Sequence, residues 1–457
     1  MKKTLSLLVA LVLTLSLVAV PAFADTTANV VGYSADRIEA KDLTNIPCLH
    51  MLAEEAYATA TEFKISSVDD LFLLADNVNK YWQTFTGVTI YLEKDLDLDE
   101  AKWTPVGYNE SGESNYFAGT FDGQGHVIDN FKVEDELAAT HAIGVFGLVK
   151  GATIKNLVVG SRAVISYTGT HGDVRVGGLA GDLRNVCTLD NNYVLATVSS
   201  ATNYCGGIVG CLNAAGSIIK NTTFAGTADG GQRVGGILGY LGNCNGTIEN
   251  CRNTGEITNN ATAAANAYTG GIVGMLNNKV GVCAVKNCIN NGEINGLQSA
   301  NGGITGMTRG DTTYEGNINY GVVELPKELF TTSGIFAAYY EEADAAKQKI
   351  LEGNQNKMGE TDATLSTVPT VTPDFFTGEC DLSAMTPPTT DAPATDAPAT
   401  NKPTTNKPTT SAPTTEAPAT QAPTEEPKKG GCGAAIGGSL AIVMMLGAAV
   451  AVTKKRK

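Results

Sequence analysis

The sequence is poor in the residues on which most catalytic centres depend. Only four histidines occur in 457 residues, and none begins an H-E-x-x-H motif, so a zinc peptidase of that kind is excluded. Gly-x-Ser-x-Gly and Cys-x-x-Cys are also absent, which removes the usual signals of a serine hydrolase and of a zinc ribbon. We therefore predict no catalytic residue, no cofactor, no cofactor-binding residue and no metal ligand.

The central part of the chain also lacks any run with an apolar period of 3.6 residues, which disfavours helical repeats. What recurs instead is a six-residue phrase, Cys-Gly-Gly-Ile-Val-Gly at 205–210 and Val-Gly-Gly-Ile-Leu-Gly at 234–239. Successive copies are 29 to 35 residues apart, a period that indicates a solenoid, a propeller or an array. One aliphatic residue takes the same place in seven copies: Val145, Leu179, Ile208, Ile237, Ile272, Ile304 and Ile335.

The second half of each repeat decides between these folds. About ten residues after the glycines stands an apolar–polar–Asn phrase, such as Ile248-Glu249-Asn250, within short β-type runs. A propeller blade needs four strands and a longer repeat, so we predict a parallel β-helix of seven to eight coils, each with three short strands. The aliphatics form an internal ladder, and corner glycines allow positive φ and close backbone approach. Stacked asparagines are expected to bond to one another at Asn253, Asn290, Asn319 and Asn356.

These phrases, and the lead-in to them, match a known pattern. The lead-in is Trp103-Thr104-Pro105-Val106-Gly107, followed by a Phe-Ala-Gly-Thr-Phe-Asp-Gly-Gln-Gly run at 117–125. Over about 63–360 the chain resembles bacterial surface proteins with GLUG-type repeats. The resemblance implies a β-helical extracellular domain and implies little about chemistry. Such repeats also accompany large IgA-specific metallopeptidases, as accessory segments beside a separate zinc domain.

The chain divides into seven parts. Residues 1–24 are a signal peptide with Lys2 and Lys3 before an apolar core. Residues 25–84 form an N-terminal cap region, in which Ser67 begins an amphipathic helix to about Tyr81 that covers the first coil. The solenoid occupies 85–360 and includes a strand over 88–92. Residues 361–385 are a C-terminal cap or spacer whose Phe375 packs against the last coil. The amphipathic helix that begins at Ser67 has an apolar face formed by Leu71, Leu74, Ala75 and Val78.

The C-terminal part indicates display at a cell surface. Prolines stand at a five-residue period from 393 to 423, so 386–433 is predicted to be a disordered Thr/Pro-rich stalk. Residues 434–453 are apolar and long enough for a transmembrane helix, and the basic tail 454–457 is cytoplasmic. No Leu-Pro-x-Thr-Gly motif precedes them, and a single anchor with a short basic tail favours a Gram-positive cell. Either the helix is a permanent anchor, or the segment is processed at Cys432.

A few residues are candidates for a site. Asp95, Asp97 and Asp99 are either calcium ligands or the solvent face of a strand. Asp122 is either a corner-turn residue or a catalytic acid, and His171 with Asp173 is the one His–Asp pair close in sequence. Ten cysteines fall mostly in the repeat phrases, where a small buried hydrophobe suffices. Cys251 and Cys288 align in adjacent coils, either as free thiols or as a disulfide.

The net charge of −15 argues against a nucleic-acid partner. We predict a non-enzymatic cell-surface protein that displays its solenoid on a stalk for adhesion or for binding an extracellular glycan or protein. The alternative is a carbohydrate-active β-helix enzyme, a polysaccharide lyase or hydrolase. Carboxylates clustered on one strand face would favour the enzyme. Aromatic, Asn and Thr rows without such a cluster would favour binding.

Overall fold

The computed structural model describes residues 30–51, 60–108, 115–135, 142–242, 244–262, 267–278, 280–296, 300–324, 336–339 and 354–375. These residues belong to the first of two compact units of the chain, Met1–Ala384. The predicted signal peptide 1–24, stalk 386–433, membrane helix 434–453 and tail 454–457 lie outside the described residues. None of the helices in the described ranges has the length and apolar character needed to cross a membrane.

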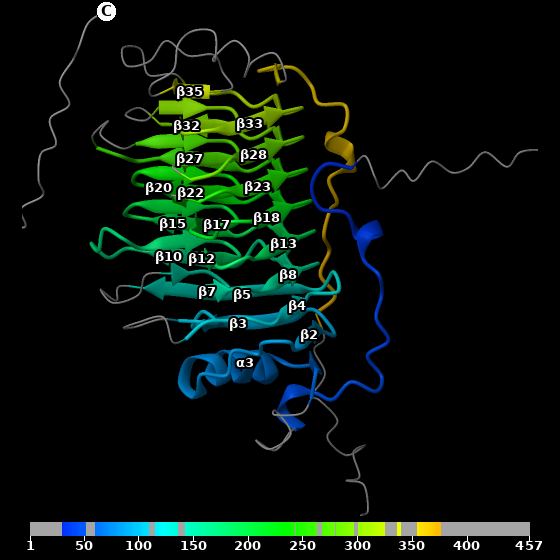
Figure 1. Ribbon diagram of the computed structural model, residues 1–457. Helices are drawn as coiled ribbons and strands as arrows, with labels where there is room; N and C mark the ends of the chain where they lie inside the picture. Colours follow the sequence, from blue (N-terminus) through cyan, green and yellow to red (C-terminus); the bar gives the residue numbers. More distant parts are fainter. Residues whose placement is uncertain are drawn as a thin grey trace, which may run out of the picture. The chain divides into compact units, whose positions relative to one another are not determined.

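The described unit is a parallel β-solenoid of about eight turns with one short α-helix near its N-terminal end, as predicted (Figure 1). Every strand pair is parallel, because each strand bonds to its counterpart one coil away. The strands form four sheets that run the length of the stack. The parallel stacking includes β1 at Glu62–Ile65, which pairs with β2 across the helix insertion.

The nine-stranded sheet contains β1 and β2 (Thr89–Leu92), β4 (Thr120–Asp122), β8 (Thr153–Lys155), β13 (Thr188–Asp190), β18 (Ser217–Lys220), β23 (Gly246–Glu249), β28 (Cys283–Lys286) and β33 (Thr312–Glu315). The six-stranded sheet contains β6 (Ala142–Ile143), β11 (Arg175–Gly177), β16 (Tyr204–Gly206), β21 (Arg233–Gly235), β26 (Tyr268–Gly270) and β31 (Ala300–Gly302). The seven-stranded sheet contains β7 (Phe146–Lys150), β12 (Ala180–Arg184), β17 (Val209–Leu212), β22 (Leu238–Gly242), β27 (Val273–Asn277), β32 (Thr305–Arg309) and β35 (Phe336–Tyr339).

The fourteen-stranded sheet has two arms that meet at the long strand β5 (Val127–Asp135), which also pairs with β3 (Leu96–Lys102). One arm contains β9 (Val158–Val159), β14 (Tyr193–Val194), β19 (Thr223–Phe224), β24 (Arg252–Asn253), β29 (Ile289–Asn290), β34 (Ile318–Asn319) and β36 (Gln355–Asn356). The other contains β10 (Val164–Tyr167), β15 (Thr197–Ser200), β20 (Thr227–Gly230), β25 (Glu256–Asn259) and β30 (Ile294–Asn295).

A coil therefore has five short strands rather than the three that we predicted; β16 to β20 make up one coil. One of the additional strands arises at the Gly-Gly corner, which separates β16 from β17. A Cβ on Gly206 would lie 1.9 Å from the carbonyl oxygen of Val209, and one on Gly210 would lie 2.6 Å from the backbone nitrogen of Val176. The two strands on either side of the corner thus pack backbone against backbone, which only glycine allows.

The same corner also points into the interior of the solenoid. A Cβ on Gly207 would lie 2.3 Å from the carbonyl oxygen of Gly236 and 2.4 Å from the ring of Phe224, which belongs to the opposite sheet. None of these corner glycines has a positive φ. Close approach is therefore what the phrase requires, and the left-handed backbone that we also expected occurs at the asparagine corners instead.

At those corners the asparagine of each apolar–polar–Asn phrase has a φ between +51° and +55°. Asparagine adopts the left-handed region more readily than other residues with a Cβ, because its short amide can bond locally. The residues concerned are Asn156, Asn191, Asn221, Asn250 and Asn287.

The interior is built from stacked ladders, as predicted. Each described member of the aliphatic ladder is at most 1% exposed, from Val145 to Ile304, while Ile335 lies outside the described residues. The predicted asparagine ladder is confirmed. The amide of Asn253 donates to Asn290 at 2.7 Å, Asn290 donates to Asn319 at 2.8 Å, and Asn319 donates to Asn356 at 3.0 Å. Buried amides with such partners avoid the cost of an unmade hydrogen bond.

A ladder of alternating charge lies on the outer face of the nine-stranded sheet. Seven residues in register with one another alternate between acid and base: Asp122, Lys155, Asp190, Lys220, Glu249, Lys286 and Glu315. Ion pairs join Lys155 to Asp122 at 3.0 Å and Lys220 to Asp190 at 3.3 Å. A slip by one coil would place like charges opposite one another, which is unfavourable, so the ladder helps to fix the register of the stack.

Helix α3, Val68–Tyr81, covers the first coil as predicted (Figure 1). The Ser67 hydroxyl accepts a hydrogen bond from the backbone of Asp70 at 3.1 Å, which is the expected N-cap. The four residues of its predicted apolar face are all buried in the main core. Asn79 on its other end bonds to the backbone of Pro105 and Gly107, so the helix is attached to the lead-in as well.

The two terminal segments pack on the outside of the solenoid beside one another (Figure 1). The N-terminal strap, residues 30–38 with η2 (Ala35–Arg37), bonds to three successive coils. Gly32 donates to Asn250, Tyr33 to Thr223 and Ser34 to Asn191, at 2.7 to 2.8 Å. Each bond bridges the strap to a different coil, so the strap ties the coils together.

The C-terminal strap, residues 354–375 with η4 (Leu365–Thr367), runs back from the last coil to the first. The backbone of Asp374 donates to Asp95 at 2.7 Å, and the Arg162 guanidinium lies 4.9 Å from the Phe375 ring centroid. Phe375 therefore packs at the first coil, and our expectation that it packs against the last coil was wrong. The two straps meet at Arg252, which bonds to Val31 of one strap and to Asp362 of the other.

Candidate functional site

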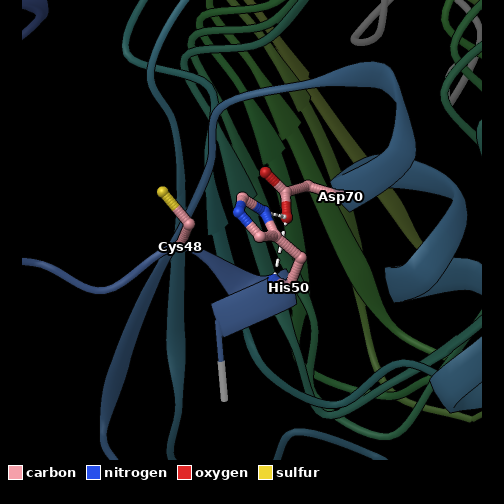
Figure 2. Close-up of side chains that lie close together, drawn as sticks. All are labelled: Cys48, His50 and Asp70. Carbon is pink, nitrogen blue, oxygen red and sulfur yellow. Dashed lines mark hydrogen bonds and ion pairs between the residues drawn. The ribbon is translucent and has the colours of Figure 1, made fainter. Parts of the chain in front are cut away.

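One group of potential metal or acid–base residues stands out below the first coil (Figure 2). In the described ranges it is the one set of three such side chains whose ligand atoms all lie within 4.8 Å of one another: Cys48, His50 and Asp70. Cys48 forms an isolated parallel β-bridge with Lys64 of β1, and His50 belongs to the single turn η3 (Leu49–Met51). Asp70 lies in the first turn of α3. Two segments of the chain, 48–50 and the start of α3, thus converge on the site.

Asp70 is held in place by several hydrogen bonds. Its side chain is fully buried. One carboxylate oxygen accepts hydrogen bonds from the His50 ring Nδ1 at 2.6 Å and from the His50 backbone amide at 2.9 Å. Its second oxygen accepts the amide and hydroxyl of Ser66 and the hydroxyl of Ser67, at 2.9 to 3.2 Å. Burial alone would raise the pKa of Asp70, but these hydrogen bonds outweigh it and lower the pKa. The carboxylate is therefore charged, and it orients the imidazole.

Cys48 lies on the other side of the imidazole from Asp70 (Figure 2). Its thiol sulfur accepts the Ser66 hydroxyl at 3.2 Å, and the residue is 6% exposed. Burial raises the pKa of the thiol, so the neutral form is favoured and Cys48 is not an activated nucleophile in this state. Thiol, imidazole and carboxylate are nevertheless the groups that bind Zn²⁺ in proteins.

Sequence reasoning missed this group for an identifiable reason. We expected no zinc site because no Cys-x-x-Cys motif occurs. The signal that was available is Cys48-Leu49-His50, a Cys-x-His pair. Its third member, 20 residues on, becomes a neighbour only when α3 packs against the first coil.

The acidic run at 95–99 forms a strand, as one of our two alternatives proposed, with Leu96 and Leu98 buried in β3. Asp95 accepts the His126 ring Nδ1 at 3.0 Å and the backbone of Asp374 in the C-terminal strap. The carboxylates thus bind groups of the protein, and the His126–Asp95 pair joins residues one coil apart.

The Arg162 guanidinium donates hydrogen bonds to two carboxylates, to that of Asp97 at 3.0 Å and to that of Asp129 at 2.9 Å. Asp99 and Glu100 have positive φ at an irregularity in the pairing of β3 with β5, which ends the alternation. In the part of the chain that the structure describes, the three aspartates do not form a cluster of metal-binding geometry.

The other candidates have structural partners. The Asp122 carboxylate accepts hydrogen bonds from the backbone amide of Gln124 and the side-chain amide of Asn156, and it forms an ion pair with Lys155. Asp122 therefore acts as a corner-turn residue. Asp173 pairs through its carboxylate with Arg175 at 3.3 Å, and its backbone amide donates to the His171 ring at 3.4 Å.

The eight cysteines that the structure describes are free and buried. The Cys251 thiol lies 3.3 Å from the backbone carbonyl of Glu249, and the Cys288 thiol lies 3.3 Å from that of Lys286. The two cysteines are therefore free thiols in this structure, the first of our two alternatives.

A row of large side chains follows the outer faces of the six- and seven-stranded sheets. The rings of Tyr204 and Tyr240 stack at 4.8 Å with an interplanar angle of 21°, and the guanidinium of Arg233 lies 5.1 and 5.2 Å from their centroids. Arg233 also donates to the Met275 sulfur at 3.3 Å, and the Tyr240 hydroxyl accepts Asn277 at 2.8 Å. The row continues with Tyr268, Ala300 and Met307, which pack against Met275 and Tyr240.

The sequence model of the GLUG motif matches residues 230–258, which run from the end of β20 into β25. The chain carries the GLUG motif. In the GLUG coil of this protein, the Gly-Gly phrase is the inward corner and the Asn phrase is the left-handed corner. The motif therefore specifies how a coil turns.

No curated protein matches the sequence. Among solved structures, a Bacteroides ovatus protein named "putative immunoglobulin A1 protease" aligns at 21% identity and a TM-score of 0.45. The alignment covers 64% of this GLUG chain and 87% of that chain. At this identity and TM-score we transfer nothing of its activity to the present protein.

Proposed function

We propose that this GLUG solenoid is a non-enzymatic binding module of a cell surface, used for adhesion or for capture of an extracellular ligand. The observation that carries the proposal is the stack of Tyr204, Arg233 and Tyr240 on the outer faces of two sheets. All three side chains are half-buried, so each is held by packing while part of it faces solvent.

Such a row suits an extended partner. Aromatic faces pack against the apolar faces of sugar rings and side chains, and a guanidinium adds directed hydrogen bonds. Tyr204 belongs to one coil, and Arg233 and Tyr240 belong to the next. Because neighbouring coils lie about 4.8 Å apart, a ligand that runs along the stack contacts side chains of both coils. Because the row is fixed by the fold, binding does not have to order it, which favours affinity. We expect a glycan, with an extended protein segment as the alternative partner.

Glycan-array binding by the full-length protein tests this proposal. The Tyr204→Ala variant should lose at least tenfold in affinity for any glycan that the wild type binds. Tyr116→Ala is a matched control, because Tyr116 is also half-buried beneath a cation, the Lys150 ammonium 4.9 Å from its ring centroid, but is not part of the row. Equal binding by both variants would remove the row from the proposal, and binding to protein but to no glycan would favour the alternative partner.

The enzyme alternative has its own observation, the ionisable cluster of Asp97, Asp129 and Arg162 beside the His126–Asp95 pair. Its carboxylates are already engaged with Arg162 and His126, which is the reason that we favour binding. Release of reducing ends or of unsaturated products from polysaccharides, abolished by Asp129→Asn, would reverse this preference.

We also propose that the solenoid is displayed outside the cell, with residues 386–433 as the stalk and 434–453 as a permanent anchor. The five-residue proline period and the apolar segment before a basic tail support this arrangement. Protease added to intact cells should release a compact domain by cutting within the stalk. Deletion of 434–457 should send the protein into the medium. Retention of that deletion variant on the cells would contradict the anchor.

A further inference from the structure

The group formed by Cys48, His50 and Asp70 has the organisation of a metal ligand pair with a supporting carboxylate. Asp70 accepts the His50 ring Nδ1 at 2.6 Å, which leaves Nε2 as the second ring position. All donors around Asp70 belong to the protein, and they occupy both of its oxygens. Metal-binding histidines are typically held in this way, by a carboxylate on the nitrogen that does not bind the metal.

We propose that the N-terminal cap binds a Zn²⁺ ion between the Cys48 sulfur and the His50 Nε2, with Asp70 as the positioning residue behind the imidazole. Figure 2 shows the imidazole between the thiol and the carboxylate, and the ligand atoms of the three side chains lie within 4.8 Å of one another. The remaining coordination positions are taken by water, because the His50 side chain is 33% exposed while Asp70 is fully buried.

The ligand types select the metal. A thiolate with an imidazole favours Zn²⁺ or Cu⁺ over the hard cations Ca²⁺ and Mg²⁺, which prefer oxygen ligands. Zn²⁺ binds sulfur at about 2.3 Å and nitrogen at about 2.0–2.1 Å, so the two ligand atoms approach one another when the ion binds. His50 belongs to a single turn of 3-10 helix, which can make such an adjustment more easily than a residue within a sheet.

Binding of Zn²⁺ also involves the release of a proton. The neutral thiol of Cys48 loses its proton when the sulfur binds Zn²⁺, while His50 keeps the Nδ1 proton that it donates to Asp70. Each bound ion therefore releases one proton, from the Cys48 thiol.

The experiment is a titration of metal-free full-length protein with Co²⁺, followed by displacement with Zn²⁺. We expect a near-ultraviolet thiolate-to-cobalt band that saturates at one equivalent and disappears with Zn²⁺. Cys48→Ser should abolish the band, and His50→Gln should weaken Co²⁺ binding at least tenfold. His126→Gln is the matched control, because His126 is also paired through Nδ1 with an aspartate but is not part of the group. This variant should bind as the wild type does.

A measurement on the wild type alone covers the case in which a variant misfolds. Zn²⁺ should slow alkylation of Cys48 at least tenfold, as measured by mass spectrometry of the peptide that contains it. No cobalt band, a band that survives Cys48→Ser, or alkylation that is independent of Zn²⁺ would each overturn the proposal. The proposal does not depend on the binding row, so either can fail without the other.

Discussion

Replacement of Arg252 by methionine is the perturbation that tests the fold most directly. Arg252 is 1% exposed and is the residue at which the two straps meet the solenoid. Its guanidinium donates to Asp362 at 2.7 Å, to Thr364 at 2.8 Å and to Asn291 at 3.0 Å, and it donates to the Val31 carbonyl at 3.1 Å. Methionine retains most of the length of the side chain and removes every one of these bonds.

The cost follows from what is left behind. The Asp362 side chain is 2% exposed, so Arg252→Met leaves a buried carboxylate with only its neutral partners. Removal of one member of a buried ion pair typically lowers the free energy of unfolding by about 3–5 kcal/mol. Lys80→Met is the control, because Lys80 also pairs with an aspartate, at 2.8 Å, but on the exposed surface of α3. An exposed pair of this kind contributes little to stability, so Lys80→Met should cost far less than Arg252→Met.

The effect should also depend on pH. Burial would raise the pKa of Asp362, but hydrogen bonds from Thr364, Asn291 and Arg252 outweigh it and lower the pKa. A carboxyl group whose pKa is lowered by folding contributes stability that is present above its unfolded pKa of about 3.9 and is lost as pH falls through the folded pKa. The difference between wild type and Arg252→Met should therefore be full at neutral pH and shrink below about pH 4.

Urea titration of the full-length protein, followed by far-UV circular dichroism, measures the free energies, and hydrogen exchange locates the loss. Exchange should accelerate first in residues 30–38 and 354–375, because these are the segments that Arg252 holds. Asp362→Asn in the Arg252→Met background should restore part of the stability, since the buried charge is then gone. Two results would refute the role of Arg252 in holding the straps. One is a loss of less than about 1 kcal/mol in the free energy of unfolding for Arg252→Met, and the other is hydrogen exchange in the straps equal to that of the wild type.

Three further predictions concern the coil itself and use the same urea titration. Asn290→Ala should cost about 1–3 kcal/mol because it breaks the buried amide ladder, whereas Asn295→Ala, at an exposed bond, should cost less than about 0.5 kcal/mol. Gly207→Ala should prevent normal packing, since its Cβ would lie 2.3 Å from a backbone oxygen, while Gly172→Ala, with nothing nearer than 3.7 Å, should be tolerated. Lys220→Glu should destabilise by about 1 kcal/mol at low salt and less at high salt, and Lys220→Gln should show a smaller and salt-independent loss. Salt-independent destabilisation by Lys220→Glu would show that the charge ladder does not act electrostatically.

The sequence by itself determined the repeat, and through it the fold. A parallel solenoid places equivalent residues one above another, so whatever a position requires recurs at every coil and becomes visible as a period. The buried aliphatics such as Ile237 and the stacked amides such as Asn290 were therefore predictable. Helix α3 was also predictable, because its N-cap at Ser67 and its apolar face are both local features.

Tertiary structure alone decided where the repeated Gly-Gly corner points and which single contacts form between distant segments. The inward direction of the Gly-Gly corner depends on a neighbouring coil and on Phe224 of the opposite sheet, and no local pattern encodes that contact. The course of the C-terminal strap back to Asp95 depends on pairs about 280 residues apart, each of which occurs once. The same holds for Cys48, His50 and Asp70, which meet only because the cap region folds against the first coil. A contact that occurs once leaves no period in the sequence, and only the folded chain brings its members together.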